Sequence, residues 1–298
     1  MPQGRQIAVS SLTKRFGPVE AVSNLSFSVE PGRVTGFLGP NGAGKTTTLR
    51  MLLGLVAPTS GTATIGGERY RDLDSPLRTV GTSLEASSFH PGRSARNHLA
   101  VYADAAGIPI TRVDEVLELV GLGAHSGRRV GGYSLGMRQR LGLAFALLGD
   151  PEVLILDEPI NGLDPEGIRW IRVFLRELAA EGRTVLVSSH LLSEVQQTVD
   201  EVVIIAKGRL VYQGQLSGLG GEAVVMVDAP ERDRLRSALA GASLIFSESD
   251  SGFAVRHTDA IAVGALALAS GVALRHLADE RAALEQAFLE LVQEGPQA

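Results

Sequence analysis

The sequence VTGFLGPNGAGKTTTLRMLLG, residues 34–54, decides the fold. It begins as a short apolar strand, continues as a glycine-rich turn and ends as a helix that stops at a glycine. The spacing Gly39-x4-Gly44-Lys45-Thr46 is the P-loop pattern, in which backbone N–H groups converge on phosphate oxygens. The stretch therefore predicts a phosphate-binding loop between a strand and a helix.

The residues of this loop have distinct expected roles. Lys45 is expected to reach the β and γ phosphates of ATP, and Thr46 to offer its hydroxyl to Mg²⁺. The positive end of the helix dipole would attract the same phosphates. A glycine-rich turn without a ligand is the alternative, but the strand before it and the helix after it favour binding. The expected contact residues are Gly39, Asn41, Gly42, Ala43, Gly44, Lys45, Thr46 and Thr47.

Composition narrows the classes of protein. The chain has 298 residues, 44% apolar and 20% charged, which allows one large domain and a small one. A net charge of −5 argues against a protein that wraps nucleic acid. The absence of cysteine excludes disulfides, iron–sulfur clusters and cysteine-bound zinc. The six histidines lack HxH and HxxxH spacings, so the only metal expected is Mg²⁺ bound with the nucleotide.

No apolar run approaches the roughly 20 residues that cross a bilayer, and the N-terminus shows no signal-peptide pattern. The longest run, 260–269, better suits a buried helix. We therefore expect a soluble chain, or one held at a membrane by a partner.

Two segments ahead of the loop, 7–13 and 19–29, are typical of strands and predict a small antiparallel sheet. Phe16 lies in the expected turn 14–17 between them, where its ring could stack on adenine. A core position is the alternative for this residue, and only the neighbouring phosphate loop favours the adenine contact.

Helical periodicity then predicts a helical insertion over about 86–150. Its glycine-rich segment 121–136 is expected to be a loop that opens into a helix over 137–148.

A continuous apolar run at 153–156 ends in Asp157 and Glu158, as a strand buried in a parallel sheet would. Ligands bind at the carboxyl ends of such strands. Asp157 is expected to hold Mg²⁺, and Glu158 to polarise the attacking water. An acidic turn without chemistry is the alternative. His190 follows the next buried strand at the same edge, where it could bond to the γ-phosphate or the water.

With His190 in place, the ordered motifs resemble those of the nucleotide-binding subunit of an ABC transporter over about residues 5–215. The resemblance implies an α/β, P-loop NTPase fold: a RecA-like core, an antiparallel β-subdomain and a helical signature subdomain within residues 1–218. The motifs are the P-loop, a signature at 133–137, the acidic strand end, a D-loop at 161–164 and the switch histidine.

The resemblance also implies that two copies pair head to tail around two ATP. Ser134, Gly136 and Asp164 of one copy would then contact the ATP held by the other. Ser134 and the N–H groups near Gly136 precede a helix, so a hydroxyl and a positive dipole end would face the γ-phosphate. Taken alone, Ser134 could also be an ordinary helix cap.

Two motifs depart from the family's usual pattern. The signature reads Tyr-Ser-Leu-Gly-Met instead of Leu-Ser-Gly-Gly-Gln, a variant that resembles exporters of the ABC-2 type, often linked to drug or antibiotic efflux. Glu85 stands where the family has the Q-loop glutamine. A carboxylate can bind Mg²⁺ or accept a hydrogen bond from water, so Glu85 takes the expected catalytic and metal-binding role of that position.

The family's partners follow from the same resemblance. Separate transmembrane permease subunits would dock near 85–97, with Phe89 and His90 as exposed candidates, and hold the chain at the cytoplasmic face of the membrane. No nucleic acid partner is expected. The alternatives are a soluble ATPase of DNA repair, iron–sulfur assembly or translation, an importer ATPase, and a regulatory cassette without activity. A single acidic cassette argues against the translation type of soluble ATPase, and intact Lys45, Glu158 and His190 argue against the inactive form.

Residues 219–298 lack phosphate-binding motifs and predict a small α+β domain. Alternation and periodicity give the order βαββαβ, with a last strand at 272–277, which suggests a ferredoxin-like unit. A final helix is expected over 280–292.

Overall fold

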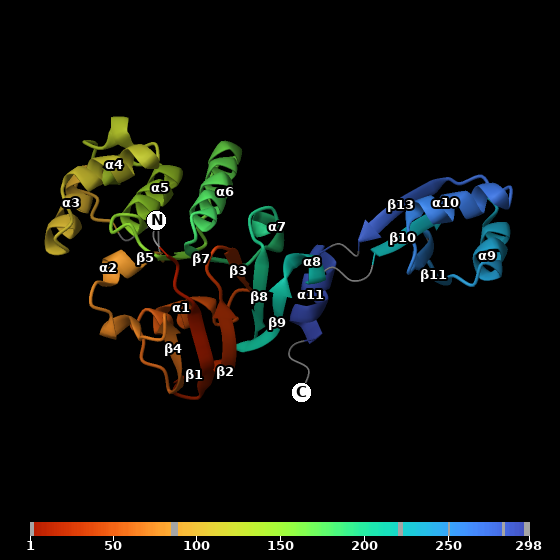
Figure 1. Cartoon of the computed structure of the whole chain (residues 1–298), viewed down its shortest axis with the longest axis horizontal. Helices are drawn as coiled ribbons and strands as arrows, with labels where there is room; N and C mark the ends of the chain where they lie inside the picture. Colours follow the sequence, from red (N-terminus) through yellow and green to blue (C-terminus); the bar gives the residue numbers. More distant parts are fainter. Residues whose placement is uncertain (1–2, 85–88, 220–222, 250, 282–283, 295–298) are drawn as a thin grey trace. The chain divides into compact units, whose positions relative to one another are not determined.

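The computed structural model describes residues 3–84, 89–219, 223–249, 251–281 and 284–294, and it divides into two compact units (Figure 1). The first unit runs to Gln215, and the second spans Leu216–Gln293.

A six-stranded sheet forms the centre of the first unit, in the order β5-β6-β7-β3-β8-β9. Its first five strands are parallel, and β9 is antiparallel to β8. Buried on both faces, β3, β6 and β7 consist of near-continuous apolar runs, as the sequence predicts. The strands are β3 (Val34–Leu38), β5 (Val80–Ser83), β6 (Val153–Asp157), β7 (Thr184–Ser189), β8 (Glu201–Ala206) and β9 (Arg209–Gln215).

Helices follow the strands of this sheet in the first unit. The segment between β5 and β6 is helical, as predicted, and α5 begins at Leu135 because the Ser134 hydroxyl accepts from the Met137 N–H at 3.2 Å. The elements are α1 (Lys45–Leu52), η1 (Tyr70–Asp72), α2 (Pro76–Thr79), α3 (Ala95–Ala105), α4 (Thr111–Leu119), η2 (Gly123–His125), η3 (Val130–Gly132), α5 (Leu135–Ala146), α6 (Pro165–Ala180) and α7 (Leu192–Val195).

The first unit also has a three-stranded antiparallel sheet in the order β2-β1-β4. Strand β2 of this sheet lies beside the phosphate loop, where Ala21 approaches Gly44. The strands are β1 (Ile7–Phe16), β2 (Val19–Val29) and β4 (Ser60–Ile65). The predicted turn at 14–17 is wrong, because β1 continues to Phe16, which pairs with Val19. Register shifts along β1 keep it paired with β2 past Thr13, so the connection shortens to two residues, 17 and 18.

The second unit contains β10 (Ala223–Asp228), α9 (Arg232–Gly241), β11 (Ile245–Ser249), β12 (Gly252–Arg256), α10 (Ala260–Ala269) and β13 (His276–Arg281). Its elements follow the order βαββαβ, and its sheet has the order β11-β12-β10-β13 with every neighbouring pair antiparallel. It also includes α8 (Leu216–Leu219) and α11 (Leu284–Glu294).

The strand predicted at 272–277 is wrong by four residues, since β13 starts at His276. Val272 and Leu274 are apolar because they pack into the core of the unit from the connection before the strand. The last helix correspondingly begins at Leu284 rather than at 280. Among the described residues, no helix is both long and apolar enough to cross a membrane.

Candidate nucleotide-binding site

The loop between β3 and α1 forms a hollow of about 520 Å³, called here the phosphate hollow. Gly44 has a φ of +103°, and a Cβ there would lie 2.6 Å from the backbone oxygen of Ala21 on β2. Glycine is therefore required for the loop to turn so close to the neighbouring strand. The lining residues are Ala21, Pro40, Asn41, Gly42, Ala43, Gly44, Lys45, Thr46, Thr47, Glu158, Asn161 and His190.

Lys45 is buried, with 6% of its surface exposed. Its Nζ donates to the backbone oxygens of Gly39, at 2.7 Å, and Pro40, at 3.3 Å, and lies 4.0 Å from Glu158 Oε1. Burial lowers the pKa of Lys45, and the carboxylates of Glu158 and Asp157 oppose that shift. A buried ammonium held beside phosphate-sized space is suited to bind an anion.

Thr46, which lines the phosphate hollow, meets Asp157 at the end of β6. The Thr46 hydroxyl donates to Asp157 Oδ2 at 3.0 Å, and the Ser188 hydroxyl donates to Asp157 Oδ1. A hydroxyl and a carboxylate are hard oxygen ligands, the kind that Mg²⁺ prefers. The residues present therefore fit a magnesium ion, which Thr46 and Asp157 would hold.

Glu158 adopts a left-handed backbone conformation, with a φ of +50°. Its N–H donates to the backbone oxygen of Ser188, at 3.2 Å, and to the Ser188 hydroxyl, at 3.1 Å. Such a conformation in a residue other than glycine costs about 1–3 kcal/mol and persists where the surroundings hold it, often at functional sites. Here the hydrogen bonds from Glu158 to Ser188 of β7 hold the backbone, and the Glu158 side chain lines the phosphate hollow.

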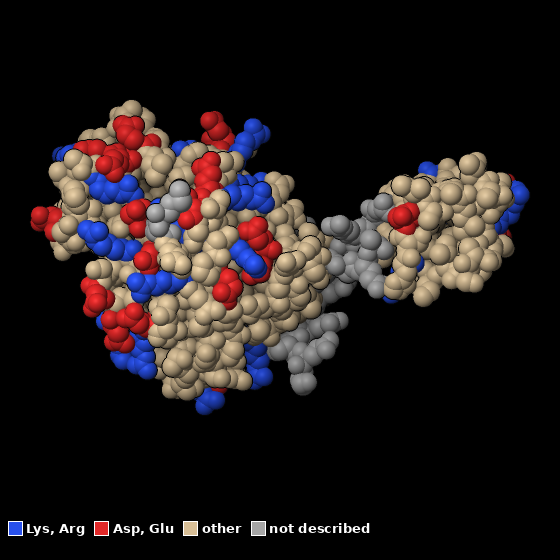
Figure 2. Space-filling view, in the orientation of Figure 1, with Lys and Arg blue, Asp and Glu red and all other residues tan. Residues whose placement is uncertain are grey.

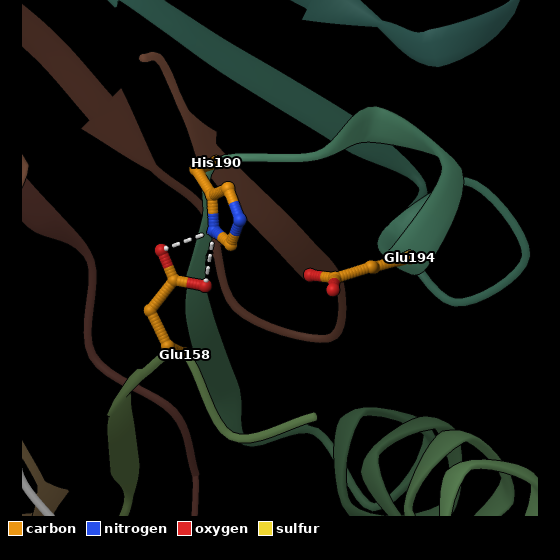
Figure 3. Close-up of side chains that lie close together, drawn as sticks. All are labelled: Glu158, His190 and Glu194. Carbon is orange, nitrogen blue, oxygen red and sulfur yellow. Dashed lines mark hydrogen bonds and ion pairs between the residues drawn. The ribbon is translucent and has the colours of Figure 1, made fainter. Parts of the chain in front are cut away.

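The His190 ring lies against Glu158 (Figure 3). Its Nδ1 is 3.0 Å from Glu158 Oε1 and 2.9 Å from Oε2. Glu194, on α7, brings a second carboxylate into the group, whose ligand atoms all lie within 4.8 Å of one another. The Ser189 hydroxyl donates to Glu194 Oε2 at 2.7 Å, which fixes the backbone beside His190.

The remaining predicted site residues lie elsewhere. Ser134 caps α5, Gly136 belongs to its first turn, and Asp164 caps α6 by accepting from the Gly167 N–H at 2.8 Å. None of these three lines the phosphate hollow of its own chain. Gly39 contributes its backbone oxygen to Lys45 rather than a wall of the hollow.

One further predicted residue, Phe16, takes no part in the described hollow. Phe16 is 50% exposed, and the Nζ of Lys14 sits 4.8 Å from its ring centroid. Phe16 is not among the residues that line the hollow. Glu85 lies outside the described residues.

Sequence reasoning missed four contributors: Ala21, Pro40, Asn161 and Ser188. Asn161 opens the D-loop motif, which could have indicated it. Ser188 immediately precedes Ser189 and His190 near the end of a buried strand, where polarity could have indicated it. Ala21 had no signal in the sequence, because only the folded sheet brings β2 against the loop.

The chain shares its motifs with known families. A family model described as ABC transporter matches residues 22–161, and one described as a domain of unknown function (DUF8746) matches residues 223–285.

Two relatives are informative. The chain is 49% identical over 210 residues to the bacitracin transport ATP-binding protein BcrA of Bacillus licheniformis, covering 70% of this chain and 69% of that protein. It is 36% identical over 212 residues to the lantibiotic transport ATP-binding protein SrtF of Streptococcus pyogenes, covering 71% and 92%.

Solved structures are similar as well. An ATP-binding subunit of an ABC transporter superposes with a TM-score of 0.65 at 27% identity, covering 72% of this chain and 91% of that chain. The dimeric bacterial ABC transporter cassette MJ0796 gives a TM-score of 0.64 at 22% identity, covering 70% and 98%. The fold class predicted from the sequence is confirmed.

Proposed function

Because the chain belongs to the ABC transporter family as an ATP-binding and ATP-hydrolysing subunit, we propose that it energises export of a peptide antibiotic through separate membrane subunits. The observation that carries this proposal is the meeting of Lys45, Glu158 and His190 in one hollow. The 49% identity to a bacitracin transport protein supports the class of substrate.

The residues of the hollow divide the chemistry among them. The P-loop N–H groups and Lys45 bind the phosphates, and the γ-phosphate replaces the backbone oxygens that now accept from Lys45. Glu158 accepts a proton from the attacking water, and His190, held against it, keeps that carboxylate oriented. Mg²⁺, held by Thr46 and Asp157, would neutralise charge on the phosphates.

A second copy completes the site in this proposal. Ser134 and Gly136 sit at the start of α5, whose first N–H groups have no partner within the helix. They do not line the phosphate hollow of their own chain, so they are available to a γ-phosphate presented by another copy. Head-to-tail pairing would bring the two together, with Asp164 near the same interface.

Mixed variants test this pairing. Neither Ser134→Arg nor Lys45→Ala should hydrolyse ATP alone, whereas mixed dimers carry one site with an intact loop and an intact signature. The mixture should therefore regain ATPase activity that neither variant has. No gain on mixing would contradict pairing in this orientation.

The docking surface for the membrane subunits is proposed beside α3. A hollow of about 320 Å³ there is lined by Phe89, His98, Tyr102 and Phe145, among others. Phe89 is half-buried, with its ring 5.0 Å from that of His98, so it forms a wall of the hollow rather than the exposed anchor expected from the sequence. His98 Nδ1 is buried without a hydrogen-bond partner. Docking there would hold the chain at the cytoplasmic face of the membrane.

The test is recovery of a tagged chain from gently solubilised membranes of the organism that encodes it. We expect a polytopic membrane protein in stoichiometric amount and an ATPase rate that rises with bacitracin or a lantibiotic. The Lys45→Ala form is the matched control, since it should bring down the same partner without ATPase activity. Recovery from the soluble fraction only, alone or with ribosomes or nucleic acid, would contradict the proposal.

A further inference from the structure

Glu194 lies beside the switch histidine but is not among the residues that line the described phosphate hollow. It belongs to α7, a helix of only four residues. Figure 3 shows its side chain pointing from α7 toward the His190 ring, which Glu158 contacts from another element. The Glu194 carboxylate therefore stands close to the site without reaching the space where the phosphates would bind.

The Glu194 carboxylate is used within the chain. The Ser189 hydroxyl donates to Glu194 Oε2 at 2.7 Å, and the same hydroxyl accepts from the Leu191 N–H at 3.1 Å. Ser189 ends β7 and is only 2% exposed, so water cannot readily replace either bond. His190 stands between Ser189 and Leu191 in the chain. The two bonds therefore fix the backbone on both sides of the imidazole ring.

Helix α7 is itself held from α6. Arg172 donates through Nη2 to the backbone oxygen of Glu194, at 3.1 Å, and through Nη1 to Gln197 Oε1, at 2.6 Å. Arg176, one turn further along α6, donates to the backbone oxygen of Thr198 at 3.3 Å. A four-residue helix gains little stability from its own hydrogen bonds, so these contacts place Glu194.

The Ser189 hydroxyl has a second acceptor within reach. The backbone oxygen of Leu191 lies 3.1 Å from it, but the hydroxyl carries only one proton. An ionised acceptor at 2.7 Å makes the stronger hydrogen bond, so Glu194 receives that proton. Loss of Glu194 should therefore loosen the backbone beside His190, whereas loss of the Ser189 hydroxyl removes both bonds.

We propose that Glu194 is a positioning residue for ATP hydrolysis, which acts through Ser189 and the backbone to hold His190 against Glu158. This role rests on the proposed function, in which His190 keeps the Glu158 carboxylate oriented. Glu194 supplies an acceptor at a fixed place, so an amide oxygen at that place should largely replace it.

Three variants test this role. Glu194→Gln keeps an acceptor for Ser189, so kcat should stay within about threefold of the wild-type value. Glu194→Ala should lower kcat about five- to tenfold, and Ser189→Ala at least as much, because it also removes the acceptor for the Leu191 N–H. The KM for ATP should change by less than about twofold in all three, since the phosphate loop is untouched. Equal losses in Glu194→Gln and Glu194→Ala would overturn the proposal.

Glu177→Ala is the matched control, because Glu177 is exposed on α6 of the same unit. Figure 2 shows acidic and basic side chains interspersed over the drawn face of the first unit, so exposed charges are part of its ordinary surface. Removing one of them should leave kcat and KM unchanged. A loss equal to that of Glu194→Ala would show that the bond to Ser189 is not the cause, and the proposal would fall.

A double-mutant cycle with His190→Ala identifies the route. If Glu194 acts through His190, adding Glu194→Ala should lower kcat by no more than about twofold once the ring is gone. An undiminished loss in that background would contradict the proposed route.

Nuclear magnetic resonance of the His190 ring separates this role from the proposed function. The signal is identified by its absence from His190→Ala and is followed without nucleotide, so it does not depend on hydrolysis. It should shift or broaden in Glu194→Ala and stay near its wild-type position in Glu194→Gln. If His190→Ala hydrolyses ATP at the normal rate, the proposed function fails at His190, and the ring signal alone tests the positioning. An unmoved signal in Glu194→Ala overturns the proposal in either case.

Discussion

The two units of this chain use apolar and polar residues in opposite ways. In the first, the apolar residues of parallel strands β3, β6 and β7 are buried, and Lys45, Asp157, Glu158 and His190 lie at the carboxyl ends of these strands. In the second, an antiparallel sheet covers one core, and the outer face of helix α10, which includes Ile261 and Leu268, is apolar and exposed. The first unit thus places polar residues suited to chemistry at strand ends, and the second exposes one apolar helix face.

This difference separates the variants that should abolish turnover from those that should leave it untouched. Changes at the phosphate hollow should act on catalysis, whereas changes on the exposed outer face of helix α10 should leave catalysis unchanged.

The largest effect is expected for Lys45→Ala. The buried ammonium lies in the hollow 4.0 Å from Glu158 and is expected to bind the phosphates, so its loss should lower kcat/KM for ATP by at least about 10²–10³-fold. Phosphate release measures the effect on turnover, and binding of a fluorescent ATP analogue measures the effect on nucleotide affinity. Leu268→Glu is the control from the second unit. Equal losses of kcat/KM in both variants would contradict the assignment of ATP hydrolysis to the first unit.

A smaller effect is expected for Ser188→Ala. Its hydroxyl donates to Asp157 and accepts from the Glu158 N–H, so two site residues lose a partner at once. A cost of about 1–2 kcal/mol corresponds to a fall in turnover of roughly tenfold. Ser249→Ala, in the second unit, is the matched control and should leave turnover unchanged. Normal turnover in Ser188→Ala would mean that β6 alone orients the acidic pair.

A still smaller effect should appear as a pH dependence of ATP affinity. Because burial lowers the pKa of Lys45 below the ordinary 10.5, the amine loses its charge at a lower pH than an exposed lysine. Affinity should therefore fall as the pH rises through that lowered pKa, at a lower pH than an exposed lysine would allow. Lys45→Arg is the control, since its guanidinium stays charged and any remaining affinity should not follow this titration.

Without nucleotide, stability should respond to the same titration with the opposite sign. The unfolded chain binds this proton more tightly than the folded chain. Between the lowered pKa and 10.5, the unfolding free energy should therefore gain a contribution that rises with pH. Denaturant titrations at several pH values would reveal it, and a contribution that falls with pH in that interval would contradict the assignment.

The smallest effect on turnover is expected on α10. Val263→Ala on its buried face should destabilise the second unit by about 1–3 kcal/mol, because it removes methyl groups from a packed core. Ile261→Glu on the exposed face should change stability by no more than about 0.5 kcal/mol. Neither should alter ATP turnover of the isolated chain. A large loss of stability with Ile261→Glu would show that the face is covered within one chain.

Much of the first unit could be predicted from its sequence because its signals are local. A buried parallel strand requires an apolar run, and a phosphate loop requires glycines at fixed spacing, so β3, β6 and the loop all left a pattern. Ala21 left none, since its place beside Gly44 depends on how β2 folds back.

The second unit was harder to predict for a physical reason. Strand β13 lies at a sheet edge and reads His-Leu-Ala-Asp-Glu-Arg, because edge strands tolerate polar and charged residues. The apolar residues just before it, Val272 and Leu274, imitate a strand although they pack from a connection. For α10, hydrophobicity predicted a buried helix, but the structure buries only one face.

The most direct test of the account is turnover by Glu158→Gln beside the wild-type chain, with phosphate release and ATP binding measured on the same samples. The amide keeps the shape of the side chain but is no longer a base. Hydrolysis should therefore fall by about 10²–10⁴-fold while ATP still binds. Near-normal turnover in Glu158→Gln would contradict the assignment of Glu158, and with it the claim that this sheet edge performs the hydrolysis.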